Sequence, residues 1–338
     1  MKAVLVRSLD DISIVEMEAP RPGPGEIVVA MKVVGICGSD TTPWYIATKA
    51  PVVLGHEPSG VVVETGAGVT SFHAGDRVVV HHHAACGVCR FCQAGEDVMC
   101  AEWKRTRLHP GGLAERVRVE AAAVATDTLR LQDGLSFEDG ALVEPVACAV
   151  KAVRRARVTS GDSVAVIGLG SNGILLGLVS RSAGAATLVG CDPDPARRAH
   201  ARRLGFDAAG EPGRDFSEKV KRASAVGADV VFVLPTTEEA VLSSLEAAGP
   251  AGRVVFYSPV EPSKTWRLSP HSLYLRDLSL LFSYSCGEAD MREALALLAR
   301  GVVRSADLVT HRVPLERAAE AFALARRGGD VLKVVVTI

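Results

Sequence analysis

The sequence lacks the features that define several protein classes. No apolar run approaches the roughly 18 residues of a membrane-spanning helix. The net charge is only −1, so the chain has no strong field with which to hold nucleic acid or an anionic membrane surface. No long repeat or low-complexity segment is present. The chain enters a strand-like run, Lys2-Ala3-Val4-Leu5-Val6, almost at once, and we therefore expect no signal peptide.

The composition is that of an ordinary globular protein. Hydrophobic residues make up 48% of the 338 residues and charged residues 23%, and this length predicts two domains that each bury a core. Of the eight cysteines, four crowd into residues 86–100. Such crowding in a long chain is typical of metal binding in a reducing compartment rather than of disulfides. We therefore expect a cytoplasmic protein.

The first third of the chain reads as β structure. Short Val- and Ile-rich runs are separated by Gly- and Pro-rich turns, which is typical of a small barrel or sandwich. We predict strands at 2–7, 11–17, 26–35, 59–64, 76–82 and 113–118.

From about residue 146 the pattern changes to apolar strands alternating with helices. Such alternation predicts a parallel, doubly wound sheet, so the fold class is α/β. The predicted strands are 163–168, 187–191, 230–234, 253–258 and 279–284, and the predicted helices between them include 171–183, 194–204 and 237–248. The tail is predicted to add helices at 288–300 and 315–326 and a last strand at 331–337.

One stretch of the β-rich part gathers metal-binding residue types. Cys37 and His56-Glu57 offer a thiolate, an imidazole and a carboxylate, which are ligand types that zinc accepts, and catalytic zinc uses three protein ligands and an open position. Ser39 places a hydroxyl two residues beyond the thiolate. A single Cys or His in such a run is more typical of a buried core residue. The combination, with a further acid at Glu144, favours a metal site.

A second cluster consists of Cys86, Cys89, Cys92 and, after seven intervening residues, Cys100. Four thiolates at this spacing can close a tetrahedral structural zinc site. An iron–sulfur cluster is the chemical alternative, but a ferredoxin-type fourth cysteine follows after three residues and precedes Pro, whereas Cys100 precedes Ala101. Two disulfides are a third alternative.

A glycine-rich loop marks the start of the βα region. Gly168, Gly170 and Gly173 form G-x-G-x-x-G after an apolar strand and before a predicted helix, with Ser171 and Asn172 between the last two glycines. This context predicts a dinucleotide site in which the phosphates face the helix N-terminus. Asp192 follows the second strand, where an acid takes ribose hydroxyls and repels a 2′-phosphate, so NAD is favoured over NADP. Arg197 and Arg198, in the next predicted helix, weaken this preference for NAD over NADP.

These segments together resemble the zinc-dependent medium-chain dehydrogenase/reductase family, which includes alcohol, sorbitol and threonine dehydrogenases. The matching segments occur in the family's order: Gly35 to Asp40, Gly55 to Glu57, Cys86 to Cys100, Pro110 to Glu115, Glu144-Pro145 and Gly168 to Gly173. The resemblance implies a GroES-like catalytic domain over 1–145, with its structural zinc lobe at 84–103. An NAD-binding Rossmann domain over 146–285 would be inserted before a return to the catalytic domain at 286–338. It also implies a homodimer or homotetramer.

The resemblance further implies roles for single residues. Cys37, His56, Glu57 and Glu144 would be ligands of a catalytic zinc, with Cys148 an outside candidate, and the four clustered cysteines would hold a second zinc. Asp40 would fix the His56 tautomer, and Ser39 would accept the hydroxyl proton. Many relatives complete this proton relay with a histidine where this chain has Thr42. His81, His82 and His83 precede the cysteine lobe, and threonine dehydrogenases have a histidine matching His83 that lies near the substrate.

The sequence thus predicts a dehydrogenase that transfers hydride between NAD and a secondary alcohol, in a polyol, sugar, cyclitol or threonine-like substrate. One alternative is an NADP-linked reductase of simple aldehydes or ketones. The other is a non-catalytic nucleotide- and zinc-binding protein on the same fold. A small-molecule alcohol or ketone is the expected partner, and neither nucleic acid nor a membrane is expected.

Overall fold

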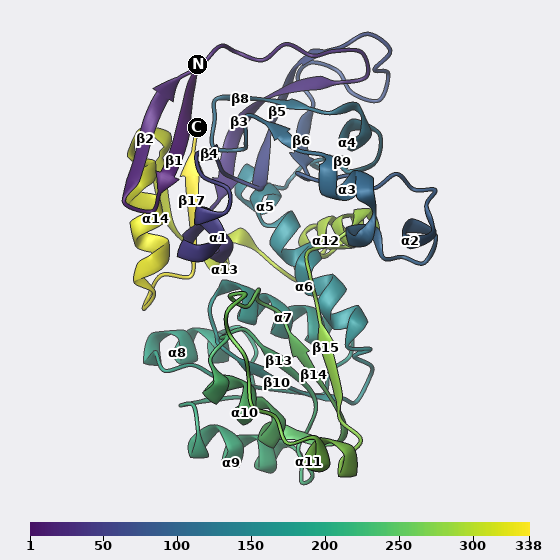
Figure 1. Ribbon diagram of the computed structural model, residues 1–338, viewed down its shortest axis with the longest axis vertical. Helices are drawn as coiled ribbons and strands as arrows, with labels where there is room; N and C mark the ends of the chain where they lie inside the picture. The colour runs from purple at the N-terminus through teal and green to yellow at the C-terminus, as the bar shows by residue number, and fades with distance from the viewer. The chain divides into compact units, whose positions relative to one another are not determined.

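The computed structural model describes all residues from 1 to 338 and divides into two compact units (Figure 1). The first unit is discontinuous and contains Met1–Ala147 and Cys286–Ile338, while the second is the intervening stretch Cys148–Ser285. No helix has both the length and the apolar character needed to cross a membrane.

The first unit is built mainly from antiparallel strands. An eight-stranded sheet has the order β16-β17-β3-β5-β6-β9, with β8 paired to β3 and β7, and a smaller sheet has the order β2-β1-β4. The strands are β1 (Lys2–Ser8), β2 (Asp11–Glu16), β3 (Ile27–Gly35), β4 (Val52–Val53), β5 (Glu57–Thr65), β6 (Arg77–Val80), β7 (Leu108–His109), β8 (Arg116–Val119), β9 (Thr128–Arg130), β16 (Val309–Pro314) and β17 (Lys333–Thr337).

Short helices connect these strands. They are η1 (Gly38–Thr41), α1 (Pro43–Ala47), α2 (Arg90–Gln93), η2 (Asp97–Met99), α3 (Ala101–Arg105), α4 (Ala121–Thr126), α5 (Phe137–Ala141), the start of α6 (Val143–Arg155), α12 (Glu288–Ala299), α13 (Ser305–Leu308), η3 (Leu315–Arg317) and α14 (Ala318–Arg327). The predicted single helix over 315–326 is in fact η3 followed by α14.

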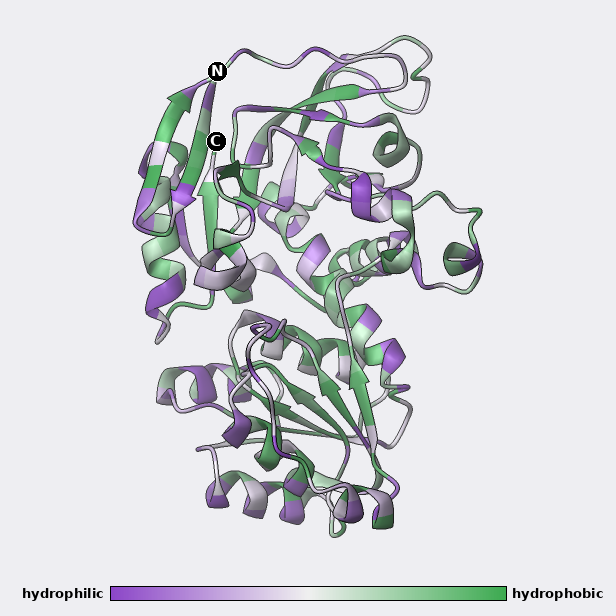
Figure 2. Cartoon of the chain, in the orientation of Figure 1, coloured by the Kyte–Doolittle hydropathy of each residue, from purple (hydrophilic) through white to green (hydrophobic).

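Apolar residues of the strands form the core of the first unit. Val29, Met31 and Val34 of β3 are buried in one cluster with β5, β8 and β17, and the strands are accordingly the most hydrophobic segments in Figure 2. The last strand matters for the site described below, because β17 pairs with β3 through Val335 and Gly35. Lys333 therefore enters the sheet beside the end of β3.

The second unit is a six-stranded parallel sheet, as predicted. Its order, β12-β11-β10-β13-β14-β15, is that of a doubly wound dinucleotide-binding fold. The strands are β10 (Ser163–Ile167), β11 (Thr187–Cys191), β12 (Ala208–Gly210), β13 (Ala228–Val233), β14 (Ala248–Phe256) and β15 (Ser279–Phe282), and the helices are α7 (Ser171–Ser182), α8 (Pro195–Arg203), α9 (Arg214–Ala223), α10 (Glu238–Ala247) and α11 (Pro270–Leu275). The sequence reading did not include the short strand β12 or helix α9.

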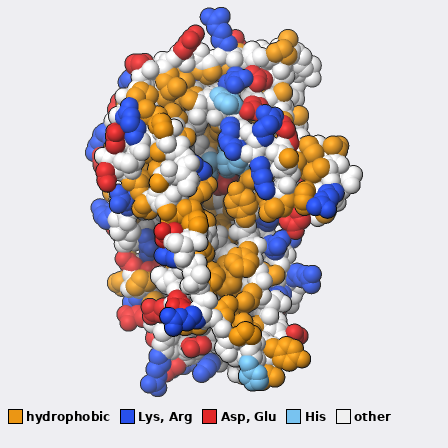
Figure 3. All heavy atoms as spheres, viewed as in Figure 1, with side chains coloured by type: hydrophobic (Ala, Val, Ile, Leu, Met, Phe, Trp, Pro, Cys, Tyr) orange, Lys and Arg blue, Asp and Glu red, His pale blue; other side chains and the backbone are white.

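Basic and acidic side chains are interspersed on the molecular face shown in Figure 3. This distribution agrees with the net charge of −1 and leaves no patch of one sign on that face.

Candidate active site

The ends of β3 and β5 bring a thiol, an imidazole and a carboxylate together. Gly35, the last residue of β3, is paired with Glu57, the first residue of β5. Cys37 follows as the N-cap of η1 and His56 precedes β5, so one ligand atom each of Cys37, His56 and Glu57 lies within 4.8 Å of the others. A side chain at Gly35 would collide with this group, because a Cβ there would stand 1.9 Å from Glu57 Oε2.

Asp40 lies behind His56. Its Oδ1 is 3.4 Å from His56 Nδ1, and its Oδ2 accepts a hydrogen bond from the Cys37 amide at 3.1 Å. This arrangement leaves His56 Nε2 for a metal ion, in the manner of the carboxylate–histidine pairs of metal sites. Burial opposes protonation of His56, but the Asp40 carboxylate and the Cys37 thiolate outweigh it and hold the His56 pKa well above its ordinary value.

Glu57, the carboxylate of this group, is buried and paired with a lysine. It is 1% exposed and forms an ion pair with the equally buried Lys333 of β17. Glu57 Oε2 is the oxygen that meets Lys333, whereas Oε1 is buried without a hydrogen-bond partner. Lys333 Nζ also donates to the Ile36 carbonyl at 3.1 Å. Burial lowers the Lys333 pKa, but the Glu57 carboxylate outweighs that effect and raises it. A buried carboxylate oxygen without a hydrogen-bond partner, beside a Cys and a His, fits a zinc ion.

Glu144 lies in a neighbouring group of donors. It is buried in the first turn of α6, and one of its carboxylate oxygens lies within 4.8 Å of ligand atoms of His81 and His82. The close group at the end of β3 contains three of the four expected catalytic-zinc ligands. Glu144 borders this group as well, because burial raises the Glu57 pKa, Lys333 opposes that rise, and the nearby Glu144 carboxylate adds to it.

The three consecutive histidines have different surroundings. The His82 ring is 5.1 Å from the His56 ring, whereas His83 stacks on Trp103 at 3.9 Å and its Nδ1 contacts the Thr106 carbonyl at 3.0 Å. His82, rather than His83, is thus the histidine beside the candidate metal site. Burial and the neighbouring His83 hold the His82 pKa well below its ordinary value, so its imidazole is neutral.

The hydroxyl groups near Cys37 lie on η1 and just after it. Ser39 is half-buried in η1, and Thr42 Oγ1 donates to the Gly38 carbonyl at 3.0 Å. Because its hydroxyl is bonded to the backbone, Thr42 does not stand in for the histidine of the family's proton relay. No hydrogen bond to the backbone is formed by the Ser39 hydroxyl, whereas the hydroxyls of Thr41 and Thr42 both donate to the Gly38 carbonyl.

The four clustered cysteines converge in a small lobe. One sulfur of each of Cys86, Cys89, Cys92 and Cys100 lies within 4.8 Å of the others, and all eight cysteines are free thiols, so the disulfide alternative is wrong. Burial opposes ionisation of Cys100, but backbone amides, first that of Cys86, lower its pKa to about 6. Cys100 packs on Trp103, whose indole donates to the Cys286 carbonyl at 3.2 Å. The lobe is therefore anchored through Trp103.

The glycine-rich loop has the expected backbone geometry. Gly168 adopts φ +94°, and a Cβ at Gly173 would stand 1.9 Å from the Gly168 carbonyl oxygen, so both positions require glycine. Ser171 and Asn172 begin α7, whose N-terminus is where a pyrophosphate binds in such folds.

Asp192, which follows β11, is hydrogen-bonded to the glycine-rich loop. Asp192 is 3% exposed and accepts hydrogen bonds from the amides of Leu169 at 2.8 Å and Asp194 at 2.9 Å. Arg197 lies 3.8 Å from the Asp192 carboxylate, while Arg198 is held by the carbonyls of Asp192 and Pro193 and by Glu211. Arg197 is therefore the arginine that pairs with the Asp192 carboxylate.

Two family models match the chain. The model described as the alcohol dehydrogenase GroES-like domain matches residues 23–128, and that described as zinc-binding dehydrogenase matches residues 173–300. Sorbitol dehydrogenase from Gallus gallus is 31% identical over 345 residues, covering 97% of this chain and 94% of that protein. The chain belongs to the zinc-dependent medium-chain dehydrogenase family.

Other relatives agree with this membership. A D-xylulose reductase A from Aspergillus fumigatus is 30% identical and covers 93% of this chain and 90% of its own. Among solved structures, 2R,3R-butanediol dehydrogenase from Bacillus subtilis has a TM-score of 0.88 at 28% identity, with 100% of this chain and 99% of that chain covered. A zinc-binding dehydrogenase from Sinorhizobium meliloti bound to NADP has a TM-score of 0.87 at 28% identity, with the same coverage.

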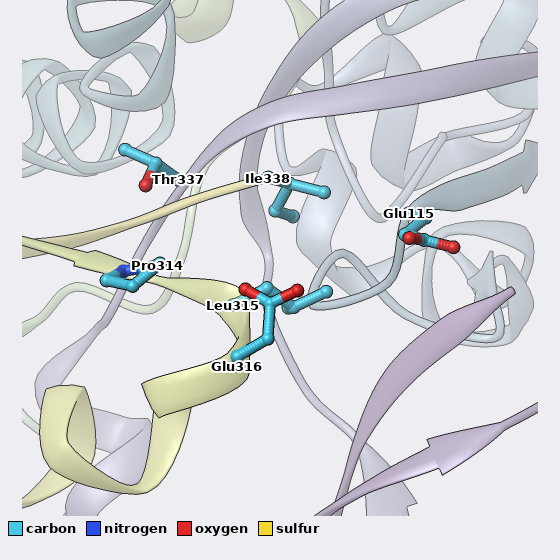
Figure 4. Close-up of a pocket in the computed structure, with 6 residues that line it drawn as sticks. All are labelled: Glu115, Pro314, Leu315, Glu316, Thr337 and Ile338. Atoms are coloured by element: carbon cyan, nitrogen blue, oxygen red, sulfur yellow. The ribbon is translucent and has the colours of Figure 1, made fainter.

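Several residues of the site were not singled out in the sequence. Lys333 had a detectable signal, because it is a charge inside the apolar run Val331 to Val336. Asp127 and Cys286, which flank His81, had none, since each is an isolated residue far from the histidine in the chain. The pocket shown in Figure 4, of about 300 Å³, is lined by Glu115, Pro314, Leu315, Glu316, Thr337 and Ile338 and contains no member of either donor group.

Proposed function

We propose that this dehydrogenase reversibly oxidises a secondary alcohol, within a polyol, sugar, cyclitol or threonine-like substrate, with NAD as hydride acceptor. The observation that carries the proposal is the convergence of Cys37, His56 and Glu57, with Glu57 Oε1 buried and without a hydrogen-bond partner. The relatives named as sorbitol dehydrogenase, D-xylulose reductase and butanediol dehydrogenase support a polyol or diol substrate.

Each group has a distinct task in the proposed reaction. A zinc ion held by Cys37, His56 and Glu57, with Glu144 as the fourth expected ligand, would supply Lewis acidity that lowers the pKa of a substrate hydroxyl. Asp40 holds the imidazole of His56 in the orientation that presents Nε2. Ser39 Oγ would accept the hydroxyl proton while its own proton passes to water. Thr42 stands where many relatives have a relay histidine, and its hydroxyl donates to the Gly38 carbonyl. The four-cysteine lobe would hold a second zinc ion for structure and would take no part in the chemistry.

The glycine-rich loop positions the dinucleotide. Gly168, Gly170 and Gly173, with Ser171 and Asn172, would hold a pyrophosphate at the N-terminus of α7, and Asp192 would bind the adenosine ribose. The cofactor supplies the redox chemistry and the protein orients it. The buried Asp192 favours NAD, while Arg197 and the NADP-bound relative favour the alternative of an NADP-linked enzyme. The ratio of kcat/KM for the two cofactors decides between them.

We also propose a cytoplasmic homodimer or homotetramer. The eight free thiols suit a reducing compartment. β15 is the edge strand of the parallel sheet, and its Phe282 is 59% exposed, so this edge is available to a second copy of the chain.

Metal analysis combined with turnover tests the proposal. We expect two zinc ions per chain, one of which mild chelation removes together with NAD-linked oxidation of polyols, cyclitols, threonine or simple alcohols. One tightly held zinc with NADH binding but no turnover on this panel would instead identify a non-catalytic binding protein.

A further inference from the structure

Two exposed cations, Lys49 and Arg107, lie near a row of histidines that leads away from the candidate metal position. The row begins at His56, continues with His82, whose ring is 5.1 Å away, and ends with His83, whose ring is 4.0 Å from that of His82. Arg107 reaches the outer end of the row, because its Nη1 lies 3.3 Å from His83 Nδ1. Lys49 acts on the middle of the row: burial is the main cause of the low His82 pKa, and the Lys49 charge adds to it after the neighbouring histidines.

Neighbouring groups hold both cations in place and leave their charges intact. Lys49 Nζ donates to Tyr45 Oη at 2.7 Å and lies 3.9 Å from the centre of the Tyr45 ring. Arg107 Nη1 donates to the Thr106 carbonyl at 2.6 Å. A side chain that is already ordered loses less rotamer entropy when it binds a ligand. Both cations are therefore prepared to bind an anion.

No acid of the site compensates these two charges. Neither Lys49 nor Arg107 forms an ion pair with a carboxylate. The three carboxylates of the candidate site, those of Asp40, Glu57 and Glu144, are all buried. An uncharged polyol gains little from two uncompensated cations, whereas a carboxylate or phosphate forms charge-assisted hydrogen bonds with them that are roughly twice as strong as neutral ones.

We propose that the alcohol substrate carries an anionic group, a carboxylate or a phosphate, that Lys49 and Arg107 attract and bind away from the reacting hydroxyl. This inference rests on the proposed function and narrows its substrate class to polyhydroxy acids and sugar phosphates. The histidine row separates Arg107 from His56, so several carbon atoms must join the anionic group to the oxidised carbon. His82 lies between the two ends, where its neutral imidazole can hydrogen-bond an intervening hydroxyl.

Turnover of matched substrates tests the proposal. The panel compares ribitol, xylitol and glucitol with their aldonates and their terminal phosphates, so that each set varies the charge on one carbon skeleton and separates a carboxylate from a phosphate. With NAD, the wild-type kcat/KM should be roughly 10- to 100-fold higher for an anion than for its neutral polyol, because charge-assisted hydrogen bonds are gained. High salt should reduce this preference, since exposed charges are screened.

Variants locate the preference on the two cations. Lys49→Met and Arg107→Met should each lower the anion-to-polyol ratio of kcat/KM roughly tenfold, whereas Arg107→Lys, which keeps the charge, should retain most of it. Lys32→Met removes an exposed lysine of β3 and should leave the ratio unchanged. A general loss of stability or of zinc cancels, because the ratio compares two substrates of the same variant.

Two results would overturn the proposal. One is a wild-type kcat/KM for neutral polyols that equals or exceeds that for the anions, which would leave the proposed dehydrogenase activity intact. The other is an anion preference that persists undiminished in both Lys49→Met and Arg107→Met. If no member of the panel is turned over, calorimetric titration of the zinc- and NADH-loaded protein with the same compounds decides. Tighter binding of an anion than of its polyol, lost in both Met variants, would support the proposal, and equal or absent binding would overturn it.

Discussion

Replacing Lys333 by Met should change the stability and the zinc affinity of this protein in opposite directions. Lys333 is a buried cation whose partner Glu57 is buried as well. Removing one partner of a buried ion pair leaves an uncompensated charge and costs about 3–5 kcal/mol. When zinc binds Glu57, the metal compensates that carboxylate. The remaining loss is then the hydrogen bond from Lys333 to the Ile36 carbonyl, worth about 1.5–3 kcal/mol.

The destabilisation caused by Lys333→Met differs between the zinc-free and the zinc-bound protein, and this difference equals the change in the free energy of zinc binding. Because the variant loses roughly 1.5–2 kcal/mol less when zinc is bound, linkage requires that Lys333→Met binds the catalytic zinc more tightly. The expected gain is roughly 10- to 30-fold, at about 1.4 kcal/mol per factor of ten. Competition with a chromophoric chelator measures the affinity. Urea unfolding followed by tryptophan fluorescence measures stability, since Trp44 and Trp103 both lie in the first unit.

A matched control separates this effect from a general loss of positive charge. Lys32 is exposed on β3, so Lys32→Met should change neither quantity appreciably. Equal destabilisation of Lys333→Met with and without zinc, or a fall in its zinc affinity, would refute the reasoning. Either result would mean that Lys333 does not compete with the metal for Glu57.

Three further changes test other parts of the site. Ser39→Ala should lower kcat roughly 10²- to 10⁴-fold in steady-state assays, because a proton acceptor is lost, and zinc content should not change; a normal kcat would assign the proton to another group. Gly173→Ala should destabilise the second unit by about 1–3 kcal/mol, because the added Cβ meets the Gly168 carbonyl. The same change should weaken NADH binding in a fluorescence titration. Unchanged NADH affinity would show that the loop accommodates the Cβ without losing its binding geometry. Cys89→Ser should release the structural zinc and expose Trp103, with a change in its fluorescence and proteolysis within 86–100, while NADH binding persists; loss of NADH binding would contradict a purely local role for the lobe.

The parts of the fold and site that the sequence predicts are those encoded by neighbouring residues. The apolar strand, the three glycines and the acid after β11 lie within 30 residues of one another, and this local pattern identifies the parallel sheet, which the structure confirms. The four clustered cysteines also lie close together in the sequence. Their sulfur atoms converge as free thiols, which excludes the disulfide alternative. In both cases short segments with restricted backbone geometry hold the functional atoms.

The remainder depends on contacts between distant segments. Glu144 is preceded by no motif that fixes which donors it faces, and only the start of α6 brings it to His81 and His82. Alternation along a strand indicates that adjacent histidines face different ways, but it does not determine which of them meets His56. Lys333 reaches Glu57 only because β17 pairs with β3. Such placements follow from tertiary packing and leave no periodic signal in the chain.

The discontinuity of the first unit has a consequence for folding. All residues of the second unit are consecutive, so its contacts can form as soon as residue 285 has been synthesised. The bond between Lys333 and Ile36, by contrast, joins positions 297 residues apart. Closing such a long loop costs entropy before any contact repays it, which slows folding. The dinucleotide-binding unit should therefore be formed early, and the pocket around Glu57 should be completed last, when β17 enters the sheet.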